Sequence, residues 1–126
     1  VAESVAGTPA RRTRPAFGGD YPSPDPILAR PYVSRALGIV RDSESLEAAI
    51  RALLPIAESK HAAADPAAVG LMVAIAALQR RESRGAHYRT DFPDHAPEAR
   101  RSEIILEAAL GLARELAHSP ALERAT

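Results

Sequence analysis

Apolar positions recur along much of the chain with the period of an α-helix. The first clear example lies between Ser43 and Ala57, where one face of a helix would be apolar throughout. The positions on that face are Leu46, Ile50, Leu53, Leu54 and Ala57. Asp42 or Ser43 is suited to cap the start of this helix. Pro55 interrupts the run, so we expect a kink or an early end near Ala52.

A denser apolar run follows and predicts the central, most buried helix. Asp65 and Pro66 mark its start, because a carboxylate caps the first turn and proline is tolerated at the first helical position. The run stays almost free of polar side chains as far as Gln79, and we expect the helix to reach about Arg84. Gly85 then suits the left-handed residue that ends a helix, with arginines of the last turn compensating the terminal carbonyls.

Two further helices flank this pair. A short leading helix is expected from Ile27 or Pro31 to Leu37, and a final one from about Pro97 to His118. The apolar stripe of the final helix would be Ile104, Ile105, Ala108, Leu112 and Leu116. No segment alternates in the manner of a strand. The sequence therefore predicts an all-α fold, a three-helix bundle with a short leading helix and a proline-rich N-terminal extension.

The domain organisation follows from proline content and length. Residues 1–26 contain five prolines and three glycines, which favours a linker or tail over helix or strand. Residues 27–126 form the helical domain, and a chain of 126 residues buries about two-thirds of its unfolded surface. We therefore expect one folded domain.

Composition excludes several classes of function. Sixteen basic and sixteen acidic residues cancel, so no global field draws the chain to nucleic acid or to an anionic membrane. The absence of cysteine excludes disulfides, thiolate metal sites and thiol nucleophiles, and it suits a reducing cytoplasm. No apolar run approaches the roughly 18 residues of a membrane span. The predicted location is cytoplasmic, with neither a membrane nor a nucleic acid as partner.

The most specific chemistry lies in residues 80–93, hereafter the signature segment, directly after the central apolar run. It contains six charged side chains, a histidine and a tyrosine, whereas a helix end needs only a glycine and one cation. Its candidate functional residues are Arg81, Glu82, Ser83, Arg84, Gly85, His87, Tyr88, Arg89, Asp91, Phe92 and Pro93.

The residue types of the signature segment suggest contacts rather than catalysis. Arg84 and Arg89 are forked donors able to grip carbonyls or carboxylates of a neighbouring domain, with acidic neighbours available as partners. Tyr88 and Phe92 would be apolar anchors, and His87 offers two ring nitrogens to a buried network. The alternative is a well-satisfied loop that only connects two helices.

The residues from Glu82 to Arg89, followed by Asp91, Phe92 and Pro93, resemble the C-terminal signature of the L-aspartate oxidase and succinate dehydrogenase/fumarate reductase flavoproteins. Residues 34–42 are similar to the start of the helical domain in the same flavoproteins. Tyr88 and Thr90 favour the oxidase, and the dehydrogenase side is the alternative.

The resemblance implies a parent enzyme several times longer, which uses FAD to oxidise L-aspartate to iminoaspartate in de novo NAD biosynthesis. The product would feed quinolinate synthase. This chain would be the C-terminal helical domain, docked on the FAD-binding and capping domains of the parent. It would hold no catalytic, cofactor-binding or metal-binding residue and would be inactive alone. An exposed docking face would favour a homodimer of the isolated chain.

Other chemistry is poorly supported by the residues themselves. His87, Asp91, Asp94 and His95 fit no recognised metal spacing. A nucleophilic pair of Ser83 and His87 lacks an evident orienting acid. Glycine pairs occur only in the proline-rich lead, without the strand and helix of a dinucleotide fold. A stand-alone helical interaction module, with no enzyme attached, remains the alternative from another class.

Overall fold

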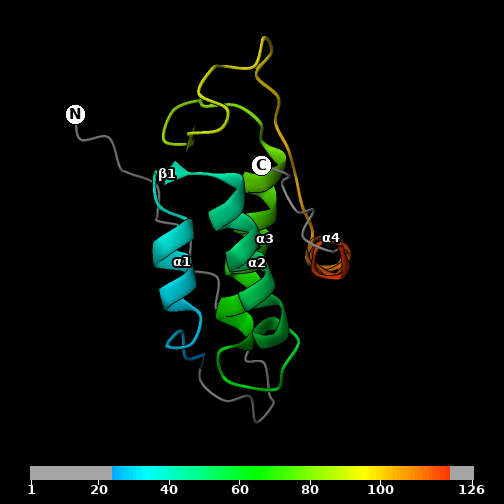
Figure 1. Cartoon of the computed structure of the whole chain (residues 1–126). Coiled ribbons are helices and arrows are strands. Elements are labelled where there is room, and N and C mark those ends of the chain that lie inside the picture. Colours follow the sequence, from blue (N-terminus) through cyan, green and yellow to red (C-terminus); the bar gives the residue numbers. More distant parts are fainter. Residues whose placement is uncertain (1–23, 120–126) are drawn as a thin grey trace, which may run out of the picture.

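The computed structural model describes residues 24–119, and helices form most of that region (Figure 1). They are α1 (Arg30–Ala36), α2 (Ser43–Ala57), α3 (Ala64–Gln79) and α4 (Leu106–His118). The predicted all-α class is confirmed. Helices α1, α2 and α3 stand side by side, whereas α4 is viewed along its axis and crosses them. The predicted linker at residues 1–26 lies almost wholly outside the described residues.

Helix α2 begins as predicted and ends later than predicted. Asp42 is its N-cap, and one carboxylate oxygen accepts a 2.8 Å hydrogen bond from the Ser45 N–H. The helix does not end near Ala52 but passes Pro55 and continues to Ala57. Proline lacks one backbone donor, and in the last turn this removes a single hydrogen bond. The buried apolar face of α2 outweighs that loss.

Helix α3 is the buried central helix, as expected, but it is shorter than predicted. It begins at Ala64, so Asp65 lies within the first turn instead of capping it. It ends at Gln79, not near Arg84, because the backbone of Arg80 is extended. The local sequence is compatible with further helix, so the cause of this end lies elsewhere in the chain and is described with the site below.

Helix α4 begins at Leu106, nine residues later than the predicted start at Pro97. Residues 97–105 are irregular and mostly exposed. Arg100 and Arg101 keep 84% and 90% of their side-chain surface in solvent. Helices draw most of their stability from burying an apolar face, and the charged run before Ile104 has none to bury.

The stripe predicted for α4 is partly wrong. Its fully buried positions are Ala109 and Ala113, whereas Ile105 and Ala108 are exposed. The remaining predicted members are half-buried and are Ile104, Leu112 and Leu116. The helix packs on α2 and α3 through its small residues. Because the helix starts late, Ile105 falls at the N-cap and escapes the packed face.

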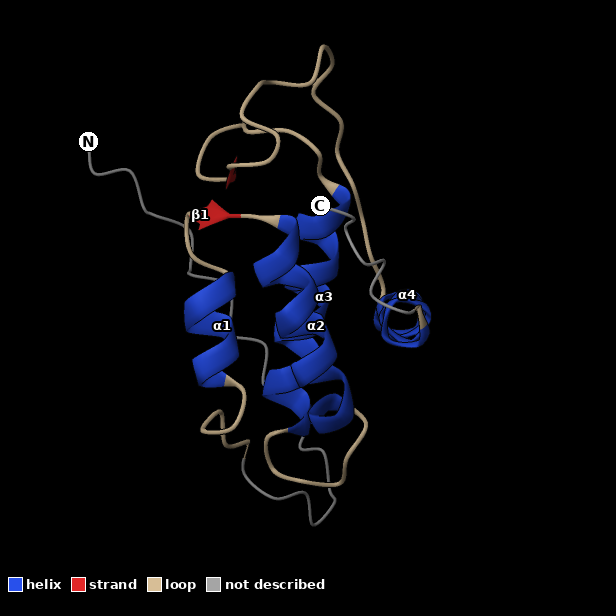
Figure 2. Ribbon diagram, viewed as in Figure 1, coloured by secondary structure: helices blue, strands red, loops and turns tan. Residues whose placement is uncertain are grey.

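A small sheet, absent from the sequence-based prediction, joins distant parts of the chain. Strands β1 (Val40–Arg41) and β2 (Tyr88–Arg89) are parallel, with Val40 opposite Tyr88 and Arg41 opposite Arg89. Figure 2 shows the two short strands above the ends of the helices. Strands of two residues are too short for an alternating pattern to reveal them.

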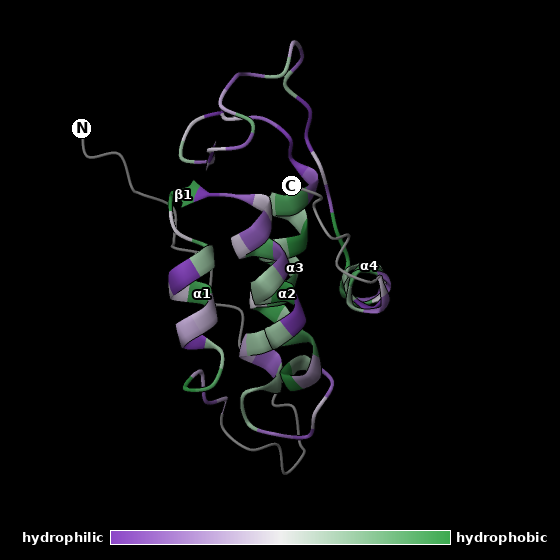
Figure 3. Cartoon of the chain, in the orientation of Figure 1, coloured by the Kyte–Doolittle hydropathy of each residue, from purple (hydrophilic) through white to green (hydrophobic). Residues whose placement is uncertain are grey.

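The hydrophobic core lies where α1, α2 and α3 meet, with α4 against one side. Its larger fully buried members are Leu46, Ile50, Leu53, Leu71 and Ile75. Figure 3 shows the apolar colour concentrated on α3, with polar residues on the loop above it. Within residues 24–119 no helix is both long and apolar enough to cross a bilayer.

Gly70 marks the closest approach of α3 to its neighbours. A Cβ at this position would lie 2.9 Å from a methyl of Val33 and 3.3 Å from one of Leu53. We expect Gly70→Ala to overpack this contact by about 1–3 kcal/mol, against a gain of about 1 kcal/mol in helix propensity. In a Val33→Ala background the same change should be harmless or stabilising. Urea unfolding of the unmodified chain, the two single variants and the double variant measures the energetic coupling between Gly70 and Val33. Additive effects of the two substitutions would contradict the predicted coupling.

Candidate functional site

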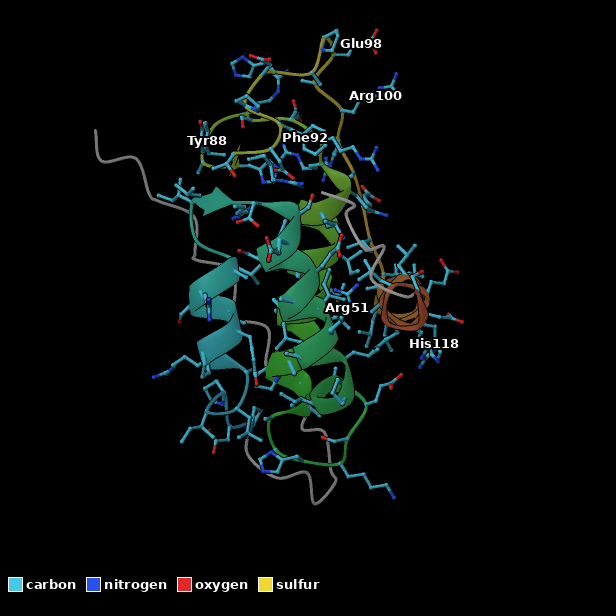
Figure 4. The ribbon with its side chains drawn as sticks, viewed as in Figure 1. Arg51, Tyr88, Phe92, Glu98, Arg100 and His118 are labelled. Atoms are coloured by element: carbon cyan, nitrogen blue, oxygen red, sulfur yellow. The ribbon has the colours of Figure 1, made fainter. Side chains whose placement is uncertain are left out.

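The signature segment folds back over the end of α3 and the beginning of α2 (Figure 4). Its first part is a tight hairpin in which the backbones of Arg84 and His87 exchange hydrogen bonds of 2.8 and 3.2 Å. Gly85 has φ +59, and no non-glycine residue from 24 to 119 has positive φ. This pattern fits a type II′ turn, which needs glycine at its first central position. Gly85 therefore makes a hairpin turn, and the prediction that it ends α3 is wrong.

Arg89 follows α3 in the sequence, and its side chain caps the C-terminal end of that helix. Its side chain is fully buried, and one guanidinium nitrogen lies 2.9 Å from the carbonyl oxygen of Ala77 and 3.2 Å from that of Leu78. It also lies 3.3 Å from the carbonyl of Arg80. These carbonyls have no partner inside the helix, so a donor from the signature segment satisfies them. The prediction that arginines of the last turn compensate the terminal carbonyls of α3 is wrong. The positive charge is supplied by Arg89, which lies farther along the chain.

Asp91 joins the same guanidinium to the first turn of α2. Its carboxylate accepts bonds of 2.8 and 2.7 Å from Arg89, which is the expected pairing. It also accepts bonds of 3.0 and 2.6 Å from the N–H and hydroxyl of Ser43. The bonds from Arg89, with those from Ser43, hold the pKa of Asp91 well below its usual range. The carboxylate thus supports the positive end of the α2 dipole.

Glu82 forms a second ionic cluster, which is also internal. Its carboxylate is 2.9 Å from the guanidinium of Arg80 and 3.0 Å from that of Arg84, and it accepts from the Ala96 N–H at 3.3 Å. The bonds from Arg80 and Arg84 lower the pKa of Glu82 to about 2. Arg84 in turn donates to the Ala96 carbonyl at 2.9 Å. This cluster fastens the hairpin to the loop that leaves it.

The Ser83 side chain connects backbone groups within the signature segment. Its hydroxyl oxygen accepts from the Arg89 N–H at 2.8 Å and lies 2.8 Å from the carbonyl of Phe92. Both bonds are local to the segment, and none reaches His87. The hydroxyl therefore lacks the base that a nucleophile requires.

His87 lies in a buried network, as the sequence suggested. Its Nδ1 accepts from Arg41 at 2.8 Å, and its Nε2 lies 3.3 Å from the carbonyl of Arg80. Burial is the main cause that lowers the pKa of His87. The hydrogen bond to the Arg80 carbonyl opposes this shift, and the charges of Arg80, Arg41 and Arg89 lower the pKa further. The imidazole is neutral and donates from Nε2. No group of three His, Asp or Glu side chains in residues 24–119 is placed to hold a metal ion.

The remaining candidate residues lie nearer the surface. Phe92 is half-buried, and the guanidinium of Arg89 stands 5.1 Å from its ring centroid, with Arg81 at 6.0 Å on the same ring. Arg81, Tyr88 and Pro93 are exposed. Figure 4 places Tyr88 above β1, at the outer end of the loop. Tyr88 thus faces solvent, whereas Arg89 is turned inward.

Sequence reasoning missed the residues outside the segment that complete the network. Arg41 and Ser43 supply partners to His87, Arg89 and Asp91 from some 46 to 48 positions away. A signal was available, since both lie in or beside residues 34–42, the second stretch that resembles the flavoproteins. The two resembling stretches form one structural unit.

These hydrogen bonds and ion pairs hold the signature segment, together with Arg41 and Ser43, against the start of α2 and the end of α3, and we call this unit the latch. The polar side chains at its heart bond to helix ends and to one another, and no buried side-chain polar atom from residue 24 to 119 lacks a partner. A hollow of about 460 Å³ lies between the end of α3 and residues 96–102 and is open to solvent. Side chains of both charges line it, with Glu82 and Glu98 beside three arginines.

Residues 59–124 match the family model for the fumarate reductase flavoprotein C-term, and the chain belongs to this family. The chain is also similar to proteins named L-aspartate oxidase. It is 51% identical to that of Mesorhizobium japonicum over 84% of the chain, and 43% identical to that of Agrobacterium fabrum over 94%. The protein of Xylella fastidiosa strain 9a5c is 46% identical over 80% of the chain.

The chain spans only about a fifth to a quarter of these relatives, covering 21%, 24% and 19% of their lengths. No solved structure matches the chain. The similarity to the relatives therefore concerns one domain of much longer proteins.

Acid should loosen the latch through Glu82. The fold lowers the pKa of this carboxyl from 4.5 to about 2, so it favours the charged form. Its contribution to stability is complete above pH 4.5 and is lost as the pH falls toward 2.

We expect Glu82→Gln to lower stability at neutral pH and to flatten the decline in stability between pH 4.5 and pH 2. Urea unfolding at several pH values measures the slope. Glu98→Gln, on a side chain 75% exposed, is the control, and equal slopes for Glu82→Gln and the unmodified chain would refute the role.

Proposed function

We propose that this chain is the C-terminal helical domain of an FAD-dependent enzyme that oxidises L-aspartate to iminoaspartate. The observation that carries the proposal is the identity of 43–51% to proteins named L-aspartate oxidase over most of the chain. The family model alone fits either branch of the flavoproteins. The oxidase is favoured because the similar relatives bear that name. The reaction would provide iminoaspartate for de novo NAD biosynthesis in the cytoplasm, where quinolinate synthase would use it.

The domain itself acts as a scaffold in this proposal. The FAD and the reacting groups belong to the FAD-binding and capping domains of the parent. Two observations support this division: the polar side chains of the latch are used within the chain, and the chain accounts for about a fifth of its relatives. The docking role of the signature segment is narrower than its residue types first suggested. Arg89 is fully buried, so contacts with a neighbouring domain fall to exposed members such as Arg81, Tyr88 and Pro93.

The reaction is tested on the purified parent enzyme. We expect FAD-dependent consumption of L-aspartate with formation of iminoaspartate, and no comparable oxidation of succinate. Turnover of succinate without turnover of aspartate would move the protein to the succinate dehydrogenase branch.

The scaffold role requires a separate test. We expect the chain of 126 residues alone to show no flavin absorbance and no turnover, while removal of residues 27–126 from the parent weakens its retention of FAD. A yellow, active 126-residue chain would overturn the proposal. Full activity and stability of the shortened parent would leave the domain without the proposed role.

A further inference from the structure

The outer edge of β1 is open. Tyr88 N–H donates to the Ile39 carbonyl at 3.1 Å, and Thr90 N–H donates to the Arg41 carbonyl at 2.9 Å. In a parallel ladder the peptide groups of alternate residues point to opposite edges. The N–H and carbonyl of Val40 therefore point away from β2, and none of the hydrogen bonds between segments of residues 24–119 uses them.

The outer edge of β2 is closed by the signature segment itself. The Arg89 N–H donates to the Ser83 hydroxyl at 2.8 Å, and the Arg89 carbonyl accepts from the Phe92 N–H at 3.2 Å. The two-stranded sheet thus offers a single edge for pairing, on the side of β1.

The open edge is flanked by exposed apolar side chains. Ile39 and Val40 are 66% and 62% exposed, and Tyr88, opposite Val40 in the register, is 42% exposed. Figure 3 shows β1 in the hydrophobic colour at the rim of the molecule. Parallel sheets in proteins are normally covered on both faces, and an isolated pair of short strands is marginally stable. This pair has the features of the end of a larger sheet.

We propose that an extended segment from the FAD-binding part of the parent chain pairs with Val40 as a third strand. Main-chain hydrogen bonds would supply the register, and the apolar side chains of Ile39, Val40 and Tyr88 would be covered by the incoming segment. The occupant follows from length: the relatives of this chain are four to five times longer than the region it matches. The inference rests on the proposed function, because it takes the parent as its source of the strand.

Amide hydrogen exchange at Val40 tests the pairing directly. In the full parent enzyme we expect its N–H to exchange about 100-fold slower than an unpaired amide, as for a strand hydrogen bond in a stable sheet. In the chain of 126 residues it should exchange at the unpaired rate, while amides in the middle of α3 remain protected and report that the chain is folded. Exchange at the unpaired rate in the parent would overturn the proposal.

Matched substitutions in the parent provide the second measurement. Val40→Pro removes an N–H that β2 does not use, and it also fixes φ at residue 40 and restricts the backbone of Ile39. An edge position tolerates proline. Val40→Thr keeps the N–H and the branched shape. We expect the proline variant to melt at least about 2 °C below the threonine variant, since it loses one strand hydrogen bond. Equal melting temperatures would count against a third strand.

The remaining outcomes separate this inference from the proposed function. Protection at Val40 already present in the 126-residue chain would assign the edge to residues 1–23, or to a second copy if it depends on protein concentration. Either result would overturn the proposal that the parent chain supplies a third strand. A parent that oxidises aspartate and protects other surfaces of this domain, with Val40 unprotected, would reject the strand and retain the function. A parent without aspartate oxidation would reject the proposed function on its own assay.

Discussion

Arg89→Met is expected to destabilise the chain by about 3–5 kcal/mol, the usual result of removing one partner from a buried ionic network. The guanidinium is fully buried and satisfies carbonyls at the end of α3, the carboxylate of Asp91 and the hydroxyl of Ser43. Methionine fills much of the same volume but donates nothing. The start of α2 and the end of α3 would then lose their common partner. Equilibrium unfolding in urea measures the change.

Two further variants show whether geometry or charge is responsible. Arg89→Lys keeps the charge but loses the planar fork that reaches Asp91 and the α3 carbonyls together, so most of the loss should remain. Arg100→Met is the control, because its side chain is 84% exposed and its ion pair with Glu98 is on the surface. A loss below about 1 kcal/mol for Arg89→Met, similar to a surface pair, would contradict the latch.

Leu53→Ala is expected to destabilise the chain by about 2–5 kcal/mol, the range for truncating a buried leucine. The side chain is completely buried on α2, and one of its methyls lies 3.3 Å from the Cβ position of Gly70 on α3. Because Gly70 has no side chain, α3 offers nothing to refill the space. The value should therefore lie in the upper part of the range.

Val69→Ala is the matched control for Leu53. It lies on α3, one residue from Gly70, yet 63% of its surface is exposed. We expect a change within about 0.5 kcal/mol, as for surface substitutions in general. Thermal and urea unfolding of both variants measure the contrast. Similar losses at the two positions would mean that the core is not centred where α1, α2 and α3 meet.

Local rules predicted those parts of the fold that local interactions determine. The Asp42 cap and the apolar face of α2 follow from residues within a few positions of each other, and both were predicted. The end of α3 was not, because Gly85 suggested a local stop whereas Arg89 caps the helix from farther along the chain. The predicted start of α4 was wrong for a related reason. Helical spacing alone does not reveal that residues 97–105 lack a surface to pack against.

The sequence singled out the signature segment but did not predict the orientation of its side chains. Residue types identified ionic partners for Glu82 and Asp91, and the pairs form. They did not reveal which side chains point inward, because Arg89 is held by Ser43 from the start of α2. That contact depends on the packing of α2 against α3, which sequence patterns leave open.

The distance along the chain between Ser43 and Asp91 implies an order of folding. Their hydrogen bonds close a loop that contains all of α2 and α3. Closing a long loop is entropically unfavourable until its contents are compact, so α2 and α3 should pair first. The signature segment then docks as a late event. Substitutions in it should accelerate unfolding and leave the refolding rate nearly unchanged.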